Sequence, residues 1–507
     1  MDELQKRIPP LTGPLLPLLP PKPLNRRLPR LPPRPATSPS RSAIAPGWTC
    51  DSLVLPAAFP RMFPNNTKRP TDPTRDPTAA AGGTKPDSLN EGFDRLVREQ
   101  LEAFTHPVSL DDRDELDKQE QLVIVGNRYR PPPPRSRNAA PSGPGLTLVL
   151  SHANEVWEPV LQDLVAELER RDSTLPIEEI WALDCTVQGD AAILNEEVIG
   201  STYNWAENGR DLLNFIAYYL DAQDANSDSS DSLPRPAPDV PPELGLLDNV
   251  ASIDPGSAIP TERTYRGRLI VGIGHSLGGS ATVFAATACP ALFSSLVLVD
   301  PVLSPPTMFD PRKTALVAMG ALRRRGVWNS RKEAKESFLA KPFFRAWDPR
   351  IVDGYVDLGM HELGTGQVAL KTKPFYEAVS PSFAALAKFP PHLEQTPAQK
   401  QITFLGSLCD TSLRSTLRLQ DLTRRLPLHY IFADTGRSML PEEATSYLLE
   451  HATPHATWTR VPGAGHLVSL EKPTETAHRL AEFLETTYPN GGGGGNGSLT
   501  KAAPAKL

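Results

Sequence analysis

Cysteine is scarce in this chain of 507 residues, and its cysteines are far apart. The four that occur show no C-x-x-C pair; they are Cys50, Cys185, Cys289 and Cys409. This spacing excludes a zinc finger and a disulfide scaffold, and it is typical of a protein from a reducing compartment. We therefore expect no metal site.

Long apolar runs and an excess of one charge are also lacking. No run approaches the roughly 20 apolar residues that a membrane-spanning helix needs. The 53 basic and 59 acidic residues leave a net charge of −6, which gives no reason to expect a nucleic acid as a partner. We expect a soluble, intracellular protein without a membrane span.

Proline, by contrast, is abundant. The chain has 55 prolines, about 11% of its residues against a background of roughly 5%, and 13 of them lie in the first 50 residues. They separate the leucines of this region, which excludes the helical core of a signal peptide and an amphipathic transit helix. We predict a disordered, proline-rich arm over 1–85, partly in polyproline-II form, with an SH3-type domain as a candidate partner.

Such an arm buries little apolar area, so the sequence predicts that its removal leaves the unfolding transition unchanged. Ordered structure is expected from about residue 120.

Short apolar strands alternate with amphipathic helices over the rest of the chain. Strands are predicted at 122–125, 146–150, 180–183, 268–272, 296–299 and 429–432, and helices at 157–168, 205–220, 280–288 and 473–488. This alternation is typical of an α/β fold with a mostly parallel sheet and helices on both faces.

Two insertions divide the predicted core into a first part, 120–304, and a second part, 401–489. The stretch 221–262 holds nine acidic residues and one basic residue, which predicts a disordered acidic insert. The stretch 305–400 has helices of its own between two core strands, where a helical cap would lie. A flexible, glycine-rich tail is expected over 490–507.

The sharpest motif is Gly274-His275-Ser276-Leu277-Gly278, which fits G-x-S-x-G. It stands directly between a predicted strand and a predicted helix. At such a strand-to-helix turn, side chains two positions either side of the serine would collide with neighbouring backbone, so both positions require glycine. The motif predicts that Ser276 is a nucleophile and that the Leu277 N–H stabilises an oxyanion.

A serine nucleophile needs a histidine base and an acid that orients the base. The chain order in this architecture is serine, acid, histidine. His466 lies in a glycine-bearing loop before the last helix and is the predicted base. Two aspartates compete as the acid, Asp300 at the end of strand 296–299 and Asp434 two residues after strand 429–432.

Asp300 is preferred because one helix and one strand separate it from Ser276. An acid used from the region of Asp434 usually sits further into the loop, where Ser438 is found. The loop after strand 146–150 is the expected source of the second oxyanion donor, the N–H of Ala153 or Asn154.

These motifs resemble the α/β-hydrolase superfamily, and more narrowly the fungal hydrolases of toxin and polyketide biosynthesis, which include peroxisomal acyl-CoA hydrolases. The resemblance covers roughly residues 121–488. The stretches that carry it are Ser151-His152-Ala153-Asn154, Trp157-Glu158-Pro159, Gly189-Asp190, Leu194-Asn195, Tyr203-Asn204-Trp205, Arg210-Asp211-Leu212-Leu213, Gly272 to Ser276, Leu298 to Pro301, Trp328 to Arg331 and Gly465-His466-Leu467.

The resemblance implies an α/β-hydrolase fold with an inserted cap and a serine hydrolase that cleaves an ester or thioester, with an acyl-CoA as one candidate substrate. It also implies an aspartate at the position of Asp300 and requires no cofactor. A serine at the nucleophile position argues against an epoxide hydrolase or a haloalkane dehalogenase, which carry aspartate there.

One departure concerns the loop next to the expected oxyanion donors. Between Asn154 and Val156 the chain is a few residues shorter than such relatives. This difference would favour the alternative function, a non-catalytic binding protein with an α/β-hydrolase fold.

The chain ends in Ala505-Lys506-Leu507, a conservative variant of the peroxisomal address Ser-Lys-Leu. The glycine-rich stretch before it would keep the tripeptide accessible. We expect the peroxisomal import receptor as a partner and the peroxisomal matrix as the location, or the cytoplasm if the tripeptide is not read.

Overall fold

The structure is a computed structural model, and it describes the chain in separate stretches. These are residues 18–30, 44–67, 108–132, 144–151, 154–200, 203–220, 267–303, 320–321, 324–374, 415–416, 419–423, 426–452 and 456–489. The predicted acidic insert 221–262, the tail 490–507 and the tripeptide Ala505-Lys506-Leu507 lie outside the described residues. The same holds for Ala153.

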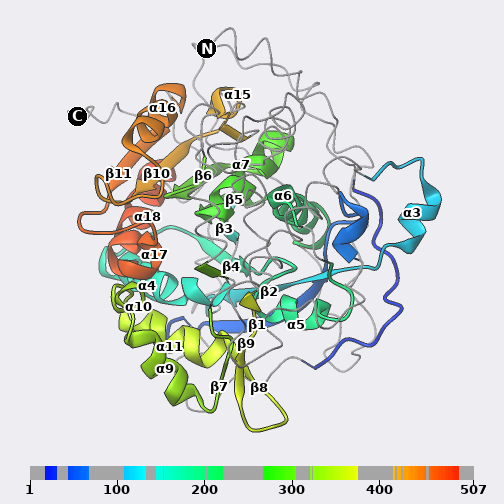
Figure 1. Cartoon of the computed structure of the whole chain (residues 1–507). Helices are drawn as coiled ribbons and strands as arrows, with labels where there is room; N and C mark the ends of the chain where they lie inside the picture. The colour runs from blue at the N-terminus through cyan, green and yellow to red at the C-terminus, as the bar shows by residue number, and fades with distance from the viewer. Residues whose placement is uncertain are drawn as a thin grey trace, which may run out of the picture.

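An eight-stranded sheet forms the centre of the described structure (Figure 1). Its order is β1-β2-β4-β3-β5-β6-β10-β11. The strands are β1 (Thr49–Pro56), β2 (Val123–Arg130), β3 (Leu146–Ser151), β4 (Ile177–Leu183), β5 (Leu269–His275), β6 (Ser295–Val299), β10 (Leu428–Phe432) and β11 (Ala456–Arg460). The pairs from β4 to β11 are parallel, whereas β2 is antiparallel to both of its neighbours. The predicted mostly parallel sheet is confirmed.

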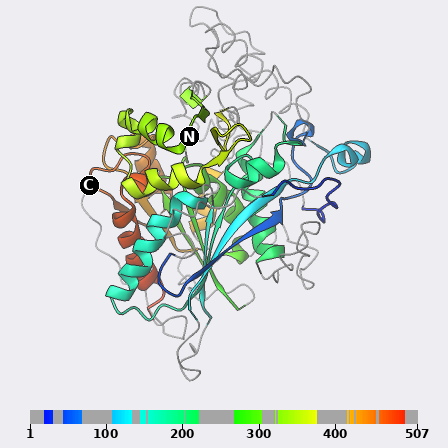
Figure 2. The same ribbon diagram turned by 90° about the horizontal axis from the view of Figure 1, so that it is seen from below.

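Helices cover both faces of this sheet, as Figure 2 shows from below. One face packs on α4 (Glu158–Arg170) and α18 (Pro473–Thr487). The other packs on α6 (Trp205–Asn214), the π-helical turn Phe215–Tyr219 and α7 (Leu277–Ala288). The side chains of β3 alternate between the two layers, because successive residues of a strand point to opposite faces.

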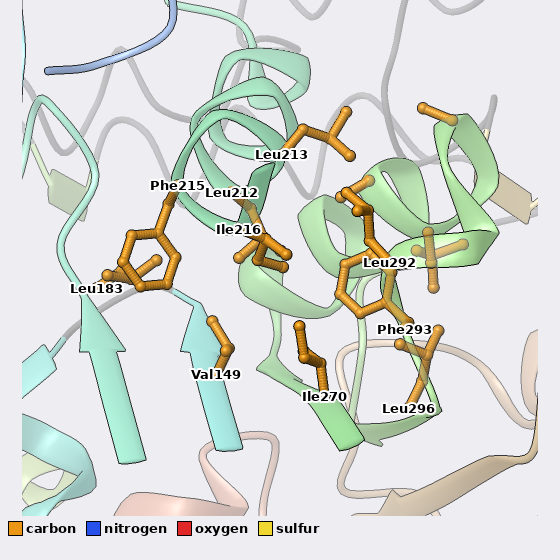
Figure 3. Close-up of a cluster of buried hydrophobic side chains, with 14 of the residues drawn as sticks. Val149, Leu183, Leu212, Leu213, Phe215, Ile216, Ile270, Leu292, Phe293 and Leu296 are labelled. Atoms are coloured by element: carbon orange, nitrogen blue, oxygen red, sulfur yellow. The ribbon is translucent and has the colours of Figure 1, made fainter. Parts of the chain in front are cut away.

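The layer beneath α6 and α7 is shown in Figure 3. Val149 of β3 and Ile270 of β5 point up from the strands, and Leu212 and Ile216 point down from the helical segment 205–219. All four side chains are almost completely buried. Val283 and Ala286 of α7 belong to the same buried cluster, which therefore holds the helix after Ser276 over the sheet.

The predicted disordered arm over 1–85 is wrong for the residues that form β1. Thr49–Pro56 pairs with β2 over all eight residues and closes one edge of the sheet. Local sequence could not reveal this strand, since its pairing partners lie 67 (Pro56 and Val123) to 81 (Thr49 and Arg130) residues away. Its one proline, Pro56, is its last residue. A strand at the sheet edge tolerates proline more readily than a central one.

The segment after β1 is held by buried ion pairs with α6. Arg61 Nη1 lies 2.6 Å from Asp211 Oδ1, and its Nε lies 3.4 Å from Glu207 Oε2. All three side chains are at most 5% exposed. Although burial opposes its charge, Asp211 and Glu207 raise the pKa of Arg61 above its ordinary value. The charges on α6 therefore bind the N-terminal segment instead of facing water.

Part of the proline-rich stretch also lies on the core. Lys22 Nζ donates to the Leu116 and Gln119 carbonyls near the end of helix α3 (Arg113–Lys118), at 2.6 and 3.1 Å. Arg26 donates to the Gln121 carbonyl at 3.0 Å. These contacts attach residues 18–30 to the start of β2, so this stretch is not a free arm. The SH3-type partner stays a prediction for the prolines outside the described residues.

The insertion between β6 and β10 contains helices, as the predicted helical cap over 305–400 does, but also a small sheet. It contains α9 (Arg331–Leu339), α10 (Pro342–Arg345) and α11 (Pro349–Leu358), and also an antiparallel three-stranded sheet. The strands of that sheet are β7 (Val327–Trp328), β8 (Met360–Glu362) and β9 (Val368–Leu370). They are two or three residues long, too short to give a period-2 pattern in the sequence.

The described core holds further elements that the sequence analysis did not predict. They are the strand β11 and the helices α5 (Gly189–Asn195), α15 (Leu419–Thr423), α16 (Glu442–Ala452) and α17 (Val468–Glu471), with 3₁₀ turns at Pro64–Thr67, Asn154–Trp157 (η4) and Pro290–Leu292. Among the described stretches, no helix is both long and apolar enough to cross a membrane.

The buried ion pair of the N-terminal segment generates a prediction for stability. Replacement of Arg61 by Met leaves Asp211 of α6 buried without its cation, while Glu207 keeps Arg210 at 3.0 Å. Breaking a buried ion pair in this way costs about 3–5 kcal/mol of unfolding free energy. Arg130→Met is the matched control: it removes an ion pair between β2 and Asp51 of β1 whose two side chains are 40% exposed, which costs at most about 1 kcal/mol. Urea unfolding of the full chain measures both, and equal losses would contradict this reading.

Candidate active site

Ser276 occupies the sharp turn between β5 and α7. Its backbone has φ 54° and ψ −120°, a conformation that a non-glycine residue adopts only when its surroundings enforce it. The Ser276 N–H donates to the Val299 carbonyl at 3.1 Å, and the Ser276 carbonyl accepts from the Val302 N–H at 3.1 Å. The turn is therefore clamped from both sides by the end of β6.

The glycines around this turn are required by close contacts. A Cβ on Gly274 would lie 2.3 Å from the carbonyl oxygen of Gly278, and a Cβ on Gly279 would lie 2.6 Å from Pro301 Cβ. No side chain fits at either distance. This crowding matches the reason for which the sequence predicted glycine at position 274, and it adds Gly279, which follows the G-x-S-x-G motif.

The structure brings the three predicted residues Ser276, His466 and Asp300 together in one hydrogen-bonded chain. Ser276 Oγ lies 2.9 Å from His466 Nε2, and His466 Nδ1 lies 2.7 Å from Asp300 Oδ2. Because a carboxylate oxygen accepts, Nδ1 carries the proton of a neutral ring and the lone pair of Nε2 points at the serine hydroxyl. The hydroxyl can therefore give its proton to His466.

Asp300 is fixed by contacts from two directions. The carboxyl group is buried, with 1% of the residue exposed. Its Oδ1 accepts the Ala433 N–H at 3.0 Å, and its Oδ2 accepts the Ser438 hydroxyl at 2.8 Å in addition to His466. Asp300 also has a positive φ of 36°, and its own N–H donates to the Ile431 carbonyl at 2.8 Å. The end of β10 thus positions an acid that belongs to β6.

Asp434, the alternative acid, lies elsewhere in the same loop region. Its carboxylate accepts the N–H of Gly463 at 2.7 Å and that of Thr435 at 2.8 Å. The backbone N–H of Gly463 and then that of Thr435 lower the pKa of this exposed carboxyl. The Asp434 N–H donates to the Ala464 carbonyl at 3.0 Å. Asp434 therefore braces the loop that carries His466, while Asp300 contacts the imidazole.

Two further contacts hold the backbone around His466. The ring of His275 donates from Nε2 to the His466 carbonyl at 2.9 Å, and it stands edge-on to the buried Trp157 with 6.5 Å between centroids. The Gly465 N–H donates to Glu471 Oε2 at 2.8 Å. His275, the variable position of the G-x-S-x-G motif, thus links the serine turn to the histidine loop.

The predicted oxyanion donors are only partly described. Leu277 opens α7, and the first N–H groups of a helix have no acceptor within the helix. Ala153 lies outside the described residues, and Asn154 begins the turn η4. Ser151 before them donates to the Gly278 carbonyl at 2.8 Å, which ties the end of β3 to the serine turn. The pairing of Leu277 with Ala153 or Asn154 stays a prediction.

The insertion 324–374 lies against segments that follow three strands of the sheet. Arg350 binds Asp163 of α4 with both Nη atoms, at 2.8 and 2.9 Å, and the Asp348 N–H donates to the Leu470 carbonyl of α17 at 2.8 Å. On the other side, Lys371 Nζ lies 2.5 Å from Asp190 of α5. α4 follows β3, α5 follows β4, and α17 follows β11 after the loop that carries His466. These contacts therefore place the insertion on the edge of the sheet that carries Ser276.

Sequence reasoning missed two groups in this arrangement. Ser438 gave no signal beyond its place in a loop, and its contact with Asp300 depends on the pairing of β6 with β10. His275 was visible in the motif, but its acceptor is a backbone atom 191 residues away. Both contacts join segments that only the sheet brings together.

Comparison with known proteins gives a family profile and several relatives. The profile of the alpha/beta hydrolase family matches residues 143–479, more than half of the chain. The abhydrolase domain-containing protein ACTT2-1 of Alternaria alternata is 28% identical over 239 residues, which cover 43% of this chain and 83% of that protein. The type I acyl-CoA thioesterase mpaH of Penicillium roqueforti is 26% identical over 244 residues, 48% of this chain and 45% of that protein.

Among solved structures, the peroxisomal alpha-beta-hydrolase Lpx1 of Saccharomyces cerevisiae is similar with a TM-score of 0.54. The sequence identity is 16%, over 90% of this chain and 93% of that one. At this identity the likeness shows the fold alone.

Replacement of Asp300 and replacement of Asp434 should reduce the reactivity of Ser276 to very different extents. Asp300→Asn removes the acceptor that keeps the proton on His466 Nδ1, and the corresponding change in a chymotrypsin-type triad costs on the order of 10⁴ in kcat. Asp434→Asn should stay within about tenfold of the wild type, because an amide oxygen still accepts one of the two N–H bonds. Cleavage of an aryl ester measures both variants, and the opposite ranking would move the acid to Asp434.

Proposed function

Because the chain belongs to the alpha/beta hydrolase family, we propose that it is a serine hydrolase that cleaves an ester or thioester through an acyl-enzyme. The observation that carries this proposal is the hydrogen-bonded chain from Ser276 through His466 to Asp300, with heavy-atom distances of 2.9 and 2.7 Å. Each residue has the chemistry, the neighbour and the order along the chain that its role requires.

In the first half-reaction Ser276 Oγ attacks the carbonyl carbon of the substrate while its proton passes to His466 Nε2. Asp300 stabilises the imidazolium that forms and keeps the ring in place. The oxyanion accepts from the Leu277 N–H at the positive end of α7 and from a second amide of the loop after β3. His466 then protonates the leaving thiolate or alkoxide as its bond to the carbonyl carbon breaks.

The second half-reaction uses the same groups with water as the nucleophile. His466 takes a proton from the water, the new oxygen bonds to the acyl carbon, and the bond to Ser276 Oγ breaks as the proton returns to the serine. The products are a carboxylic acid and regenerated enzyme. Every proton transfer in this scheme runs through His466, so no cofactor is required.

For the substrate we propose an acyl thioester, with acyl-CoA as the first class to examine. The support is similarity: one set of relatives carries the name type I acyl-CoA thioesterase. The relatives come from Alternaria and Penicillium, in line with a role in fungal secondary metabolism that the resemblance to toxin and polyketide hydrolases suggested. A panel of acyl-CoAs and aryl esters of matched acyl chains would rank thioester against ester.

A fluorophosphonate probe tests the serine mechanism directly. We expect covalent labelling of the full chain that is lost in Ser276→Ala and slowed by several powers of ten in His466→Ala, since the probe requires an activated hydroxyl. Ser173→Ala is the matched control for loss of a hydroxyl, because Ser173 lies in the turn between α4 and the start of β4, at the end of the sheet opposite to Ser276. Absence of labelling in the wild type would support a non-catalytic binding protein instead.

The C-terminal tripeptide Ala505-Lys506-Leu507 supports a peroxisomal location and the import receptor as a partner. Deletion of the three residues should leave esterase activity unchanged, because a glycine-rich stretch separates them from α18. In fungal cells, the same deletion should move a protein with an N-terminal fluorescent tag from puncta to diffuse cytosol. Diffuse fluorescence of the intact chain would contradict the peroxisomal location.

A further inference from the structure

The insertion carries a small apolar surface that the catalytic scheme does not use. Three large apolar side chains of the described structure are prominently exposed: Leu339 at 39%, Phe343 at 53% and Met439 at 45%. Leu339 ends α9 and Phe343 lies in α10, so two of the three are four residues apart. In Figure 1, α9 and α10 lie at the margin of the molecule. We call residues 339–345 the cap tip.

The ring of Phe343 rests on a buried aromatic base. It packs edge-on against Phe344 at 5.1 Å and Trp347 at 5.6 Å between centroids. Phe344 is 3% exposed and packs in turn on Phe338 and Tyr355. The Phe343 ring therefore lies on top of a packed aromatic layer, with its outer side exposed to solvent.

The charges at the cap tip are of one sign. From Ser337 to Trp347 the chain has no acidic residue, and it has two basic ones, Lys341 and Arg345, both exposed. Within the described stretches no ion pair joins either of them to an acid. Other cations of the insertion are paired: Arg325 with Glu333 at 2.7 Å, Lys335 with Asp353 at 2.5 Å and Arg350 with Asp163 at 2.8 Å.

We propose that the cap tip docks on an anionic lipid membrane. Exposed leucine and aromatic side chains that are flanked by Lys and Arg suit the boundary between lipid headgroups and acyl chains. Although the net charge of the chain is −6, the two exposed cations Lys341 and Arg345 stand beside Leu339 and Phe343, and such cations are attracted to anionic lipid. A protein partner would require a larger apolar centre than these two side chains provide.

The position of the cap tip determines which side of the protein would face the membrane. The insertion that carries it contacts α4, α5 and α17, which follow the strands at the Ser276 edge of the sheet. Docking through residues 339–345 would therefore turn this edge toward the membrane. The inference rests on the exposed residues and their charges, and it holds or fails independently of the serine mechanism.

Vesicle flotation of the purified full chain tests the proposal. One set of vesicles consists of phosphatidylcholine alone and the other of phosphatidylcholine mixed with phosphatidylserine. We expect the anionic vesicles to retain the chain more strongly by roughly an order of magnitude, and high salt to remove most of this difference.

Two double variants separate the two contributions. Leu339→Ser with Phe343→Ser should abolish most of the binding to both vesicle types. Lys341→Gln with Arg345→Gln should remove the preference for anionic lipid. The matched controls are Met439→Ser, the third exposed apolar side chain, and Lys118→Gln on α3, and both should bind as the wild type does.

Circular dichroism and thermal unfolding establish that every variant is folded. Equal retention of the wild type by both vesicle types would overturn the proposal, as would undiminished binding by both double variants. If the wild type binds no vesicles but self-associates through these residues in light scattering, the cap tip is an interface between copies of the chain and the membrane proposal is wrong.

Discussion

The turn at Ser276 is the constraint on which the rest of the site depends. Its backbone conformation, φ 54° and ψ −120°, is held because the Gly278 carbonyl approaches Gly274 more closely than any side chain would permit and because the end of β6 clamps both sides of the residue. The hydrophobic layer between β5 and α7 keeps this turn in place. Without that packing, the serine would relax and its hydroxyl would leave the line toward His466.

Around this turn, a buried carboxylate organises segments that are remote in sequence. Asp300 closes β6, but the N–H of Ala433 and the hydroxyl of Ser438, which come after β10, satisfy it together with His466. Burial of a carboxylate without hydrogen-bond partners costs free energy of folding, and these contacts offset that cost. Asp434 and His275 hold the histidine loop by its backbone. The imidazole is thereby positioned from the strand ends of β5, β6 and β10.

The elements at the two margins of the core serve different purposes. The N-terminal segment adds β1 to the edge of the sheet, and its Arg61 forms ion pairs with the buried acids of α6. Both contacts stabilise the core. The insertion between β6 and β10 is attached to the core mainly by polar contacts, such as Arg350 with Asp163 and Lys371 with Asp190. Its own aromatic cluster is separate from the two core layers. An insertion built in this way can vary its exposed surface without disturbing the sheet.

The sequence by itself determined the α/β class, most of the central strands, and Ser276 with His466, because apolar periodicity and the glycine spacing of a strained turn are local properties. It preferred Asp300 as the acid but kept Asp434 as the alternative, since both follow strands and only the pairing of β6 with β10 decides which carboxylate faces the imidazole. It misjudged Thr49–Pro56 and the short strands of the insertion, and it did not predict the contact of Ser438 with Asp300. Each of these depends on a hydrogen-bond partner far along the chain, and a strand without its neighbour has no local signature. Tertiary structure decided them because a sheet brings together residues that sequence keeps apart.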